Sequence, residues 1–165
     1  MVSAALFAVQ TFLVWRGGCL LISRKKELAI KAVINGNMRT EPPVSEDEDA
    51  KMSGMYARIV RYMEDRKPFL DDDFCIFDLA KSVYSNRTYI SKVINYYSGR
   101  NFKQFVNYFR VKYSVELMKK DLRLSVMELA TMSGFHSVVT YNLAFRLNMD
   151  DTPANYKKQI NLGRL

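Results

Sequence analysis

The sequence predicts an all-α protein in which two helix-turn-helix motifs are joined by a long linker helix. Two observations predict this class: two similar helical patterns 50 residues apart and a long helical segment between them. An N-terminal membrane-like helix and an acidic linker precede the motifs. We therefore divide the chain into a membrane-like segment with a basic stretch (1–34), a flexible acidic linker (35–51), an amphipathic connecting helix (52–73) and the double-motif domain (74–165).

The first motif, residues 74–95, reads as two short amphipathic helices separated by a tight turn. Ser85 or Asn86 is a fitting N-cap for the second of these helices. Ala80 places a small residue where two crossing helices would touch, and Ile90 places a branched residue where the second helix turns inward. This is the pattern of a helix-turn-helix, whose second helix enters the major groove of DNA.

A second copy of the motif lies between residues 124 and 146. Four positions recur 50 residues later: Leu79 and Ala80 as Leu129 and Ala130, Val83 as Ser133, and Val93 as Leu143. Ser125 and Glu128 have the spacing of a capping box, which predicts a helix start at this point. One such match is a weak signal, but two in register predict a double helix-turn-helix.

Residues 102–120 form one long periodic segment between the motifs. Its apolar face is made of Phe102, Phe105, Val106, Phe109, Tyr113 and Leu117, while Lys103, Asn107, Arg110 and Lys119 lie largely off that face. A helix of this length spans about 27 Å at 1.5 Å per residue. It could therefore hold the two motifs about one turn of DNA, roughly 34 Å, apart.

Residues 2–23 are apolar enough to be a membrane span. About 20 apolar residues are needed to cross a bilayer, so the segment is long enough if Arg16 is tolerated within it. Basic residues follow it and no charge precedes it, which places the rest of the chain on the cytoplasmic side of the cell membrane. The alternatives are a buried core helix and the last helix of a larger sensor.

The linker and the connecting helix are predicted from composition and period. Residues 35–51 contain a Pro-Pro pair and the acidic run from Glu46 to Asp49, a composition typical of an exposed linker. From Met52 to Lys67, apolar residues recur at helical spacing, so we expect a helix that covers the first motif. A coiled-coil seam is the alternative, but the segment is short for one. The carboxylates of Asp71 to Asp73 favour the start of a helix; the alternative is a metal site.

The charge of the chain is unevenly distributed. Its formal net charge is +8, yet residues 1–73 carry 11 basic and 11 acidic side chains, against 14 basic and 6 acidic in residues 74–165. A basic surface attracts a polyanion such as nucleic acid. The charge therefore points to the same half of the chain as the motifs.

From about Phe74 to Ile160, the sequence resembles the DNA-binding domain of AraC/XylS-type transcription regulators. In the first half, the resemblance rests on Leu79-Ala80, on residues 86–92, and on Gly99, Phe102, Phe105, Arg110 and Tyr113. The second half carries Ala130, Gly134-Phe135, Tyr141, Phe145-Arg146, Met149, Thr152-Pro153 and Tyr156. The sequence departs from the family pattern at Thr140, where an aromatic residue is usual, and at Asp150, where glycine is common. The order of an apolar helix followed by this domain also resembles membrane-associated regulators.

The resemblance implies that both recognition helices bind double-stranded DNA. On the first helix it assigns base or phosphate contacts to Arg87, Thr88, Ser91 and Lys92. On the second helix it assigns DNA contacts to Ser137, Val138, Val139, Asn142 and Arg146. Val138, Val139 and Leu143 stand at positions that in the family often carry polar base-reading side chains. Valine contacts thymine methyl groups but cannot donate a hydrogen bond to a base edge, so we expect the first helix to dominate direct readout.

The residues give no positive support for an enzyme. His136 is the single histidine, so neither a catalytic triad nor a histidine metal site can be built, and no phosphate-binding glycine loop is present. We therefore expect no cofactor and no metal. The expected partners are double-stranded DNA, the transcription machinery and, through residues 2–23, the membrane; the oligomeric state is left open. The competing hypothesis is a truncated regulator that acts as a helical protein-interaction module without DNA binding.

Overall fold

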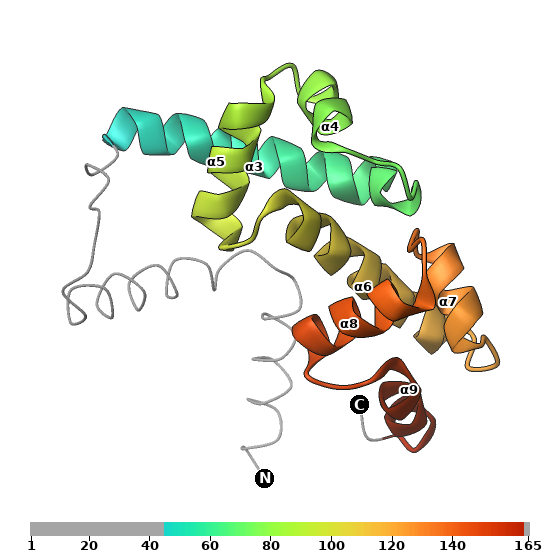
Figure 1. Cartoon of the computed structure of the whole chain (residues 1–165). Helices are drawn as coiled ribbons and strands as arrows, with labels where there is room; N and C mark the ends of the chain where they lie inside the picture. The colour runs from blue at the N-terminus through green and yellow to red at the C-terminus, as the bar shows by residue number, and fades with distance from the viewer. Residues whose placement is uncertain (1–44, 164–165) are drawn as a thin grey trace, which may run out of the picture. The chain divides into compact units, whose positions relative to one another are not determined.

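The computed structural model describes residues 45–163, which form seven α-helices and one 3-10 helix and contain no strand. The predicted all-α class is confirmed. The elements, drawn in Figure 1, are α3 (Glu46–Arg66), η1 (Pro68–Leu70), α4 (Ile76–Ser82), α5 (Arg87–Ser98), α6 (Phe102–Lys120), α7 (Val126–Met132), α8 (Val138–Met149) and α9 (Pro153–Asn161). The expected membrane segment, residues 2–23, lies outside the described residues. Among the helices that are described, none combines the length and the apolar character that a bilayer span needs.

Helix α3 begins at Glu46, six residues before the helix start expected at Met52. The acidic run is therefore the first turn of a helix, where negative side chains are favoured by the helix dipole, and is not part of the linker. Further along, Met52, Ile59 and Met63 are fully buried. The hydroxyl of Ser82 donates to that of Tyr62 at 2.9 Å, so α3 covers the first motif as expected.

The first motif consists of α4 and α5. Of the two candidate N-caps for α5, the structure selects Asn86, whose side chain accepts a hydrogen bond from the Tyr89 amide at 2.9 Å. Inside the motif, Leu79, Ile90 and Val93 are buried. The predicted spacing of small and branched apolar residues thus places the packed faces correctly.

The second motif consists of α7 and α8. The capping box predicted at Ser125 and Glu128 is confirmed, with hydrogen bonds of 3.2 and 2.7 Å in the two directions. Ser137 caps α8 by accepting a hydrogen bond from the Thr140 amide at 3.2 Å. Asp150, which stands where glycine is common in the AraC/XylS pattern, ends α8 in the left-handed conformation at φ 53°.

The turn of the second motif is one residue longer than that of the first. As a result, α7 follows α4 by 50 residues, as expected, whereas α8 follows α5 by 51. The predicted equivalence of Leu143 with Val93 is therefore wrong. The buried equivalent of Val93 is Ala144, and Leu143 is exposed.

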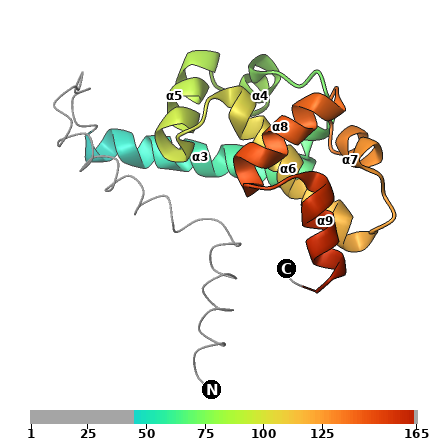
Figure 2. The ribbon, with the colours of Figure 1, turned by 60° about the horizontal axis from the view of Figure 1, so that its bottom comes forward.

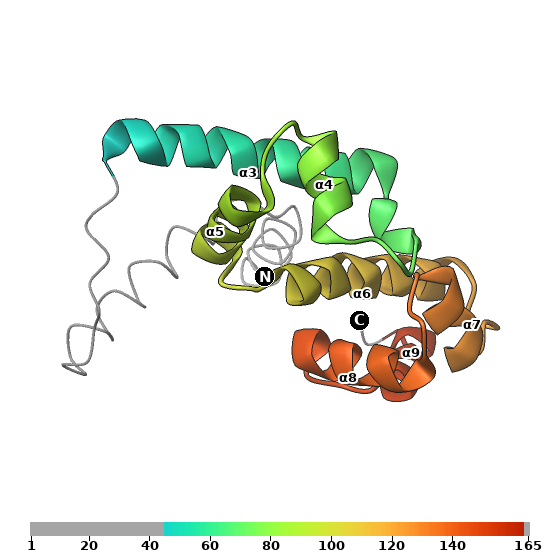
Figure 3. The same cartoon turned by 45° about the horizontal axis from the view of Figure 1, so that its top comes forward.

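Helix α6 has the predicted bounds and runs between the two motifs (Figure 3). Its first half buries Phe105 and Phe109 beside α3 and the first motif. Its second half belongs to the core of the second motif, together with residues of α7 and α8, through Val111, Val115, Leu117 and Met118. The helix is thus buried on more than the single face that its sequence predicted.

Helix α9 completes the second motif. It lies against α8 (Figure 2), where the rings of Tyr156 and Phe145 meet edge to face with centroids 5.5 Å apart. Thr152 caps it, and Pro153 stands at its first position. These contacts place α9 on the core side of α8 and leave the opposite face of α8 uncovered by it.

Candidate nucleic-acid interface

The exposed face of α5 carries the four residues predicted to bind DNA. Arg87, Thr88 and Lys92 are exposed and Ser91 is half-buried. Arg87 extends over the ring of Phe77 on α4, with its guanidinium carbon 5.1 Å from the ring centre. The alternation with core-facing residues that the sequence predicts is present, and the four side chains lie together on one helix.

The first turn of α3 contacts this face of α5. Glu48 forms an ion pair with Lys92 at 2.9 Å, and both side chains are about half exposed. One helical turn further, the Tyr97 hydroxyl donates to the Asp49 carboxylate at 2.9 Å, and burial together with this carboxylate raises the pKa of Tyr97 to about 12. Neither contact could be predicted from local patterns, because the ion pair joins residues 44 positions apart and the hydrogen bond joins residues 48 positions apart.

The five residues predicted on the second motif differ in their exposure. Ser137, Val139 and Arg146 are exposed, and Asn142 is half-buried. Val138, however, is half-buried and packs against the core of the second motif, so it is turned away from the exposed face expected for it. Tyr141 is fully buried, with its hydroxyl donating to Ser114 on α6 at 3.2 Å, and burial raises its pKa to about 12.

Two exposed residues of α8 were not assigned to the site from the sequence. Leu143 and Leu147 are 61% and 71% exposed. They follow Val139 at intervals of four residues, which places all three on one side of the helix. The family resemblance places Leu143 at a base-reading position, whereas the 50-residue repeat aligns it with the buried Val93; the structure exposes it.

Neither recognition helix contains a carboxylate. Residues 87–98 include Arg87 and Lys92, and residues 138–149 include Arg146, with no Asp or Glu in either stretch. Carboxylates close to phosphates would repel them, whereas lysine and arginine attract them. Both helices are therefore chemically suited to approach a polyanion.

The segment that follows α3 ties the two motifs together through Arg110. This residue, on α6, is only 8% exposed. Its Nε donates to the carbonyl of Phe69 at 2.7 Å, and its Nη2 donates to that of Asp71 at 2.8 Å. Its guanidinium also lies 5.6 Å from the ring centre of Phe135, in the turn of the second motif. Helical periodicity predicts Arg110 largely off the apolar face of α6, whereas the structure buries it at the junction.

Gly134 makes the closest approach at this junction. Its φ is 78°, in the left-handed region. A Cβ added there would lie 2.4 Å from the carbonyl oxygen of Phe69 and 2.7 Å from that of Leu70. Only glycine allows the turn to have this conformation and also lie against the backbone of η1.

His136 and Asp72 add an exposed contact between the same segments. The His136 Nδ1 and the Asp72 Oδ2 atoms are 2.9 Å apart. The hydrogen bond to the carboxylate raises the pKa of His136, and the same bond lowers the pKa of Asp72. The pair is therefore favoured in its doubly charged form.

The carboxylates of Asp71, Asp72 and Asp73 lie within 4.8 Å of one another and are exposed. Two of them already have protein partners, since Asp72 contacts His136 and Asp71 accepts a hydrogen bond from the Asp73 amide at 3.0 Å. The helix-start role expected for this run is filled by Asp78, whose carboxylate accepts from the amide of the α4 N-cap Cys75 at 3.0 Å. The three aspartates instead belong to the junction between the motifs.

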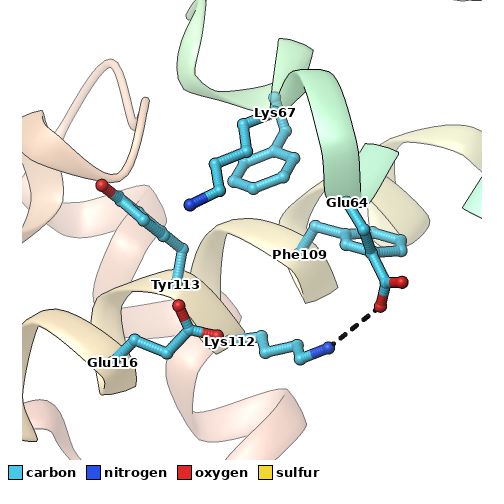
Figure 4. Close-up of a pocket in the computed structure, with 7 residues that line it drawn as sticks. Glu64, Lys67, Phe109, Lys112, Tyr113 and Glu116 are labelled. Atoms are coloured by element: carbon cyan, nitrogen blue, oxygen red, sulfur yellow. Dashed lines mark hydrogen bonds and ion pairs between the residues drawn. The ribbon is translucent and has the colours of Figure 1, made fainter. Parts of the chain in front are cut away.

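An open pocket lies beside η1 and α6 (Figure 4). A salt bridge of 3.2 Å between Lys112 and Glu64 crosses it, and the Lys67 ammonium lies 4.8 Å from the ring centre of Tyr113. Two lysines and two glutamates are among its lining residues, which are Glu64, Lys67, Phe69, Phe109, Lys112, Tyr113 and Glu116. Because these charges balance, the pocket favours neither an anion nor a cation.

Comparison with known proteins relates this fold to transcription regulators. No family model matches the chain. The regulatory protein PocR of Salmonella typhimurium is 30% identical over 125 residues, which cover 76% of this chain and 38% of PocR. The TCP pilus virulence regulatory protein of Vibrio cholerae is 29% identical over 79 residues, which cover 48% of this chain and 28% of that protein. The chain thus spans well under half the length of these relatives.

Solved structures with this fold include DNA-binding domains. The DNA-binding domain of AdpA, crystallised with a target DNA, matches with a TM-score of 0.56 and 25% identity, over 66% of this chain and 94% of that one. A Chromobacterium violaceum regulator described as AraC-type matches with a TM-score of 0.57 and 17% identity, over 67% and 95% of the two chains. These similarities agree with the arrangement of two motifs on one shared helix. We conclude that residues 45–163 have the fold of these DNA-binding domains.

Proposed function

We propose that this protein is a sequence-specific DNA-binding transcription regulator that reads DNA through α5 and α8 in successive major grooves. One observation carries the proposal: two complete helix-turn-helix units on one shared helix present recognition helices that have no carboxylate. On α5, Arg87, Thr88, Ser91 and Lys92 offer hydrogen-bond donors to bases and phosphates. The second motif offers a less polar surface, made of Ser137, Val139, Asn142 and Arg146. Val138 packs against the core of this motif. We propose that the chain has no catalytic role. When bound to DNA, the regulator would contact the transcription machinery.

The test is selection of binding sites from random duplexes by the full chain, purified in a buffer with a non-ionic detergent. We expect a bipartite site whose halves are about one helical turn, roughly 34 Å, apart. Titration with salt should lower the affinity steeply, because each phosphate contact releases counterions. No enrichment at any salt concentration would reject the proposal in favour of the protein-interaction module.

Substitution of Lys92 tests the residue assignment. Lys92→Ala should weaken specific binding by about 1 to 3 kcal/mol and relax the base preference in one half of the site. Lys51→Ala is the matched control, because it removes an exposed lysine from α3, outside both motifs. An unchanged base preference in the Lys92 variant would remove this residue from the reading set.

We further propose that residues 2–23 hold the protein at the membrane with the DNA-binding domain on the cytoplasmic side. The support lies in the sequence: this segment carries Arg16 as its single charge, and Arg24, Lys25 and Lys26 follow it. Fractionation of cells that express the full chain, or the chain without residues 2–23, tests the proposal. The full chain should sediment with membranes and resist extraction by high salt, and the shortened chain should not. Equal distribution of both would reject the tether and leave the DNA-binding proposal standing.

A further inference from the structure

The uncovered face of α8 is apolar. Val139, Leu143 and Leu147, which we call the α8 stripe, are 78%, 61% and 71% exposed. The opposite face of the same helix is packed, with Tyr141, Ala144 and Phe145 buried. Single exposed apolar side chains are common on protein surfaces, but an aligned row of three is not and marks an interaction surface.

The equivalent face of α5 in the first motif carries the proposed reading residues. With the 51-residue offset of the recognition helices, Val139 stands where α5 carries Thr88, and Leu143 stands where α5 carries Lys92. Both of these α5 residues are exposed and belong to the proposed reading set. Val139 and Leu143 of the α8 stripe thus stand at the positions of the proposed reading face of α5, with apolar side chains where α5 has hydrogen-bonding ones.

The charge around the stripe favours DNA over an apolar protein partner. Residues 138–149 contain no carboxylate, and Arg146, exposed and three residues after Leu143, is available to a phosphate. In the major groove, the one apolar group on a base edge is the C5-methyl of thymine. An apolar reading face flanked by arginine therefore matches a thymine-containing stretch of duplex.

We propose that Val139 and Leu143 select thymine in the half-site bound by α8, through contact with the C5-methyl group. This inference rests on the proposed function and adds a specificity to it: hydrogen bonds read one half of the site, and methyl groups read the other. Val139 and Leu143 lie in the first two turns of α8, the part of a recognition helix that contacts base edges. Leu147 lies in the last turn, beyond the part that reads bases.

Replacement of thymine by deoxyuridine isolates the methyl group, because uracil keeps the base pair and the O4 acceptor. The selected bipartite duplex is made with uracil in one half or the other, and Lys92→Ala identifies the half bound by α5. In the α8 half, we expect each contacted thymine that becomes uracil to weaken binding about fourfold, the value of burying one methyl-sized group.

Three variants of the full chain test which side chain makes the contact. Leu143→Ala should weaken binding to the thymine duplex and abolish the difference between thymine and uracil in the α8 half. Leu147→Ala is the matched control, an exposed leucine on the same face that should preserve the difference, and Val139→Ala should reduce it. Because all three side chains are exposed, we expect their thermal unfolding to match that of the unmodified chain.

The outcomes separate this inference from the proposed function. If the unmodified chain selects no duplex, both fail. If it selects a bipartite site but Leu143→Ala keeps the full difference between thymine and uracil, the methyl readout is wrong and the regulator proposal stands. If Leu143→Ala instead changes the mass of the protein in light scattering and leaves DNA affinity unchanged, the stripe binds a second copy of the chain and the inference is overturned.

Discussion

Glu48 and Lys92 form an ion pair of 2.9 Å that joins the first turn of α3 to the proposed reading face of α5. The lysine proposed to reach a base edge is thus held by a carboxylate of the same chain. For Lys92 to bind DNA, this pair has to open, and the carboxylate then lies near the phosphates. In the proposed complex, DNA and Glu48 would therefore compete for the ammonium group of Lys92.

Removing the carboxylate should strengthen DNA binding. Glu48→Gln keeps the size of the side chain and removes the charge that pairs with Lys92, so affinity for DNA should rise by about twofold to fivefold, the range expected for half-exposed ion pairs. Fluorescence anisotropy with the selected duplex measures the change. Asp47→Asn, which removes the same charge from the same turn, is the control and should have the smaller effect. Equal gains in both variants would mean that only the net charge of this turn matters.

Gly134 should tolerate no side chain. In Gly134→Ala, the new methyl group meets the carbonyls of Phe69 and Leu70 and the residue is strained at φ 78°, so the free energy of unfolding should fall by about 3 kcal/mol or more. Gly99→Ala is the control, because Gly99 has a similar φ of 64° but open space around it, and should cost about 1 to 2 kcal/mol. Urea unfolding compares the two. Similar losses would show that the turn moves away from η1 at little cost.

The pair of His136 and Asp72 should make stability depend on pH. The raised pKa of His136 means that its contribution is present below the ordinary value of 6.5 and is lost as the pH rises through the raised value. The lowered pKa of Asp72 means that its contribution is present above 3.8 and is lost as the pH falls. The unmodified chain should therefore exceed His136→Asn in stability most clearly near pH 5.5, and the difference should shrink by pH 8.5. A difference that does not vary between these pH values would exclude the pair as its cause.

We expect Arg110 to stabilise the junction that sets the spacing of the two motifs. Arg110→Met removes the donors to the carbonyls of Phe69 and Asp71 and leaves them without these partners, which costs about 1 to 3 kcal/mol of stability for each. Arg110→Lys keeps the charge but not the planar fork, so it should restore only part of the loss. We expect both variants to lose more affinity for the bipartite duplex than for an isolated half-site. An equal loss on both duplexes would show that the junction does not set the spacing of the motifs.

The sequence predicted the elements of this fold better than their long-range contacts. Helix α6 and the cap at Ser125 follow from local periods and spacings, and the structure has them as predicted. The repeat failed by one residue at Leu143 because both candidate positions, Leu143 and Ala144, are apolar, and hydrophobic pattern alone cannot distinguish them. The caps Asn86 and Ser137, 51 residues apart, carried the correct register.

Arg110 and Glu48 show why the rest of the site could not be read from the sequence. Arg110 is buried because its partners are backbone carbonyls 41 and 39 residues upstream. Every residue has a backbone carbonyl, so the sequence does not indicate which one a side chain will contact. The acidic run containing Glu48 has the composition of an exposed linker, and its contacts with α5 join residues 44 and 48 positions apart. Charge and composition therefore pointed to the partner that we propose for the domain, but not to the internal contact between Glu48 and Lys92.

Because α6 supplies apolar side chains to both motifs, neither motif has a complete hydrophobic core without this helix. A cut after residue 120 would leave Val111, Val115 and Met118 of α6 facing water, and the second motif would lose the wall on which Tyr141 packs. In native-state hydrogen exchange, we expect the amides of α5 and α8 to become exchangeable in one cooperative opening. A substitution in α6 affects both cores at once. Loss of structure in one half of the reading surface would therefore also disturb the other half.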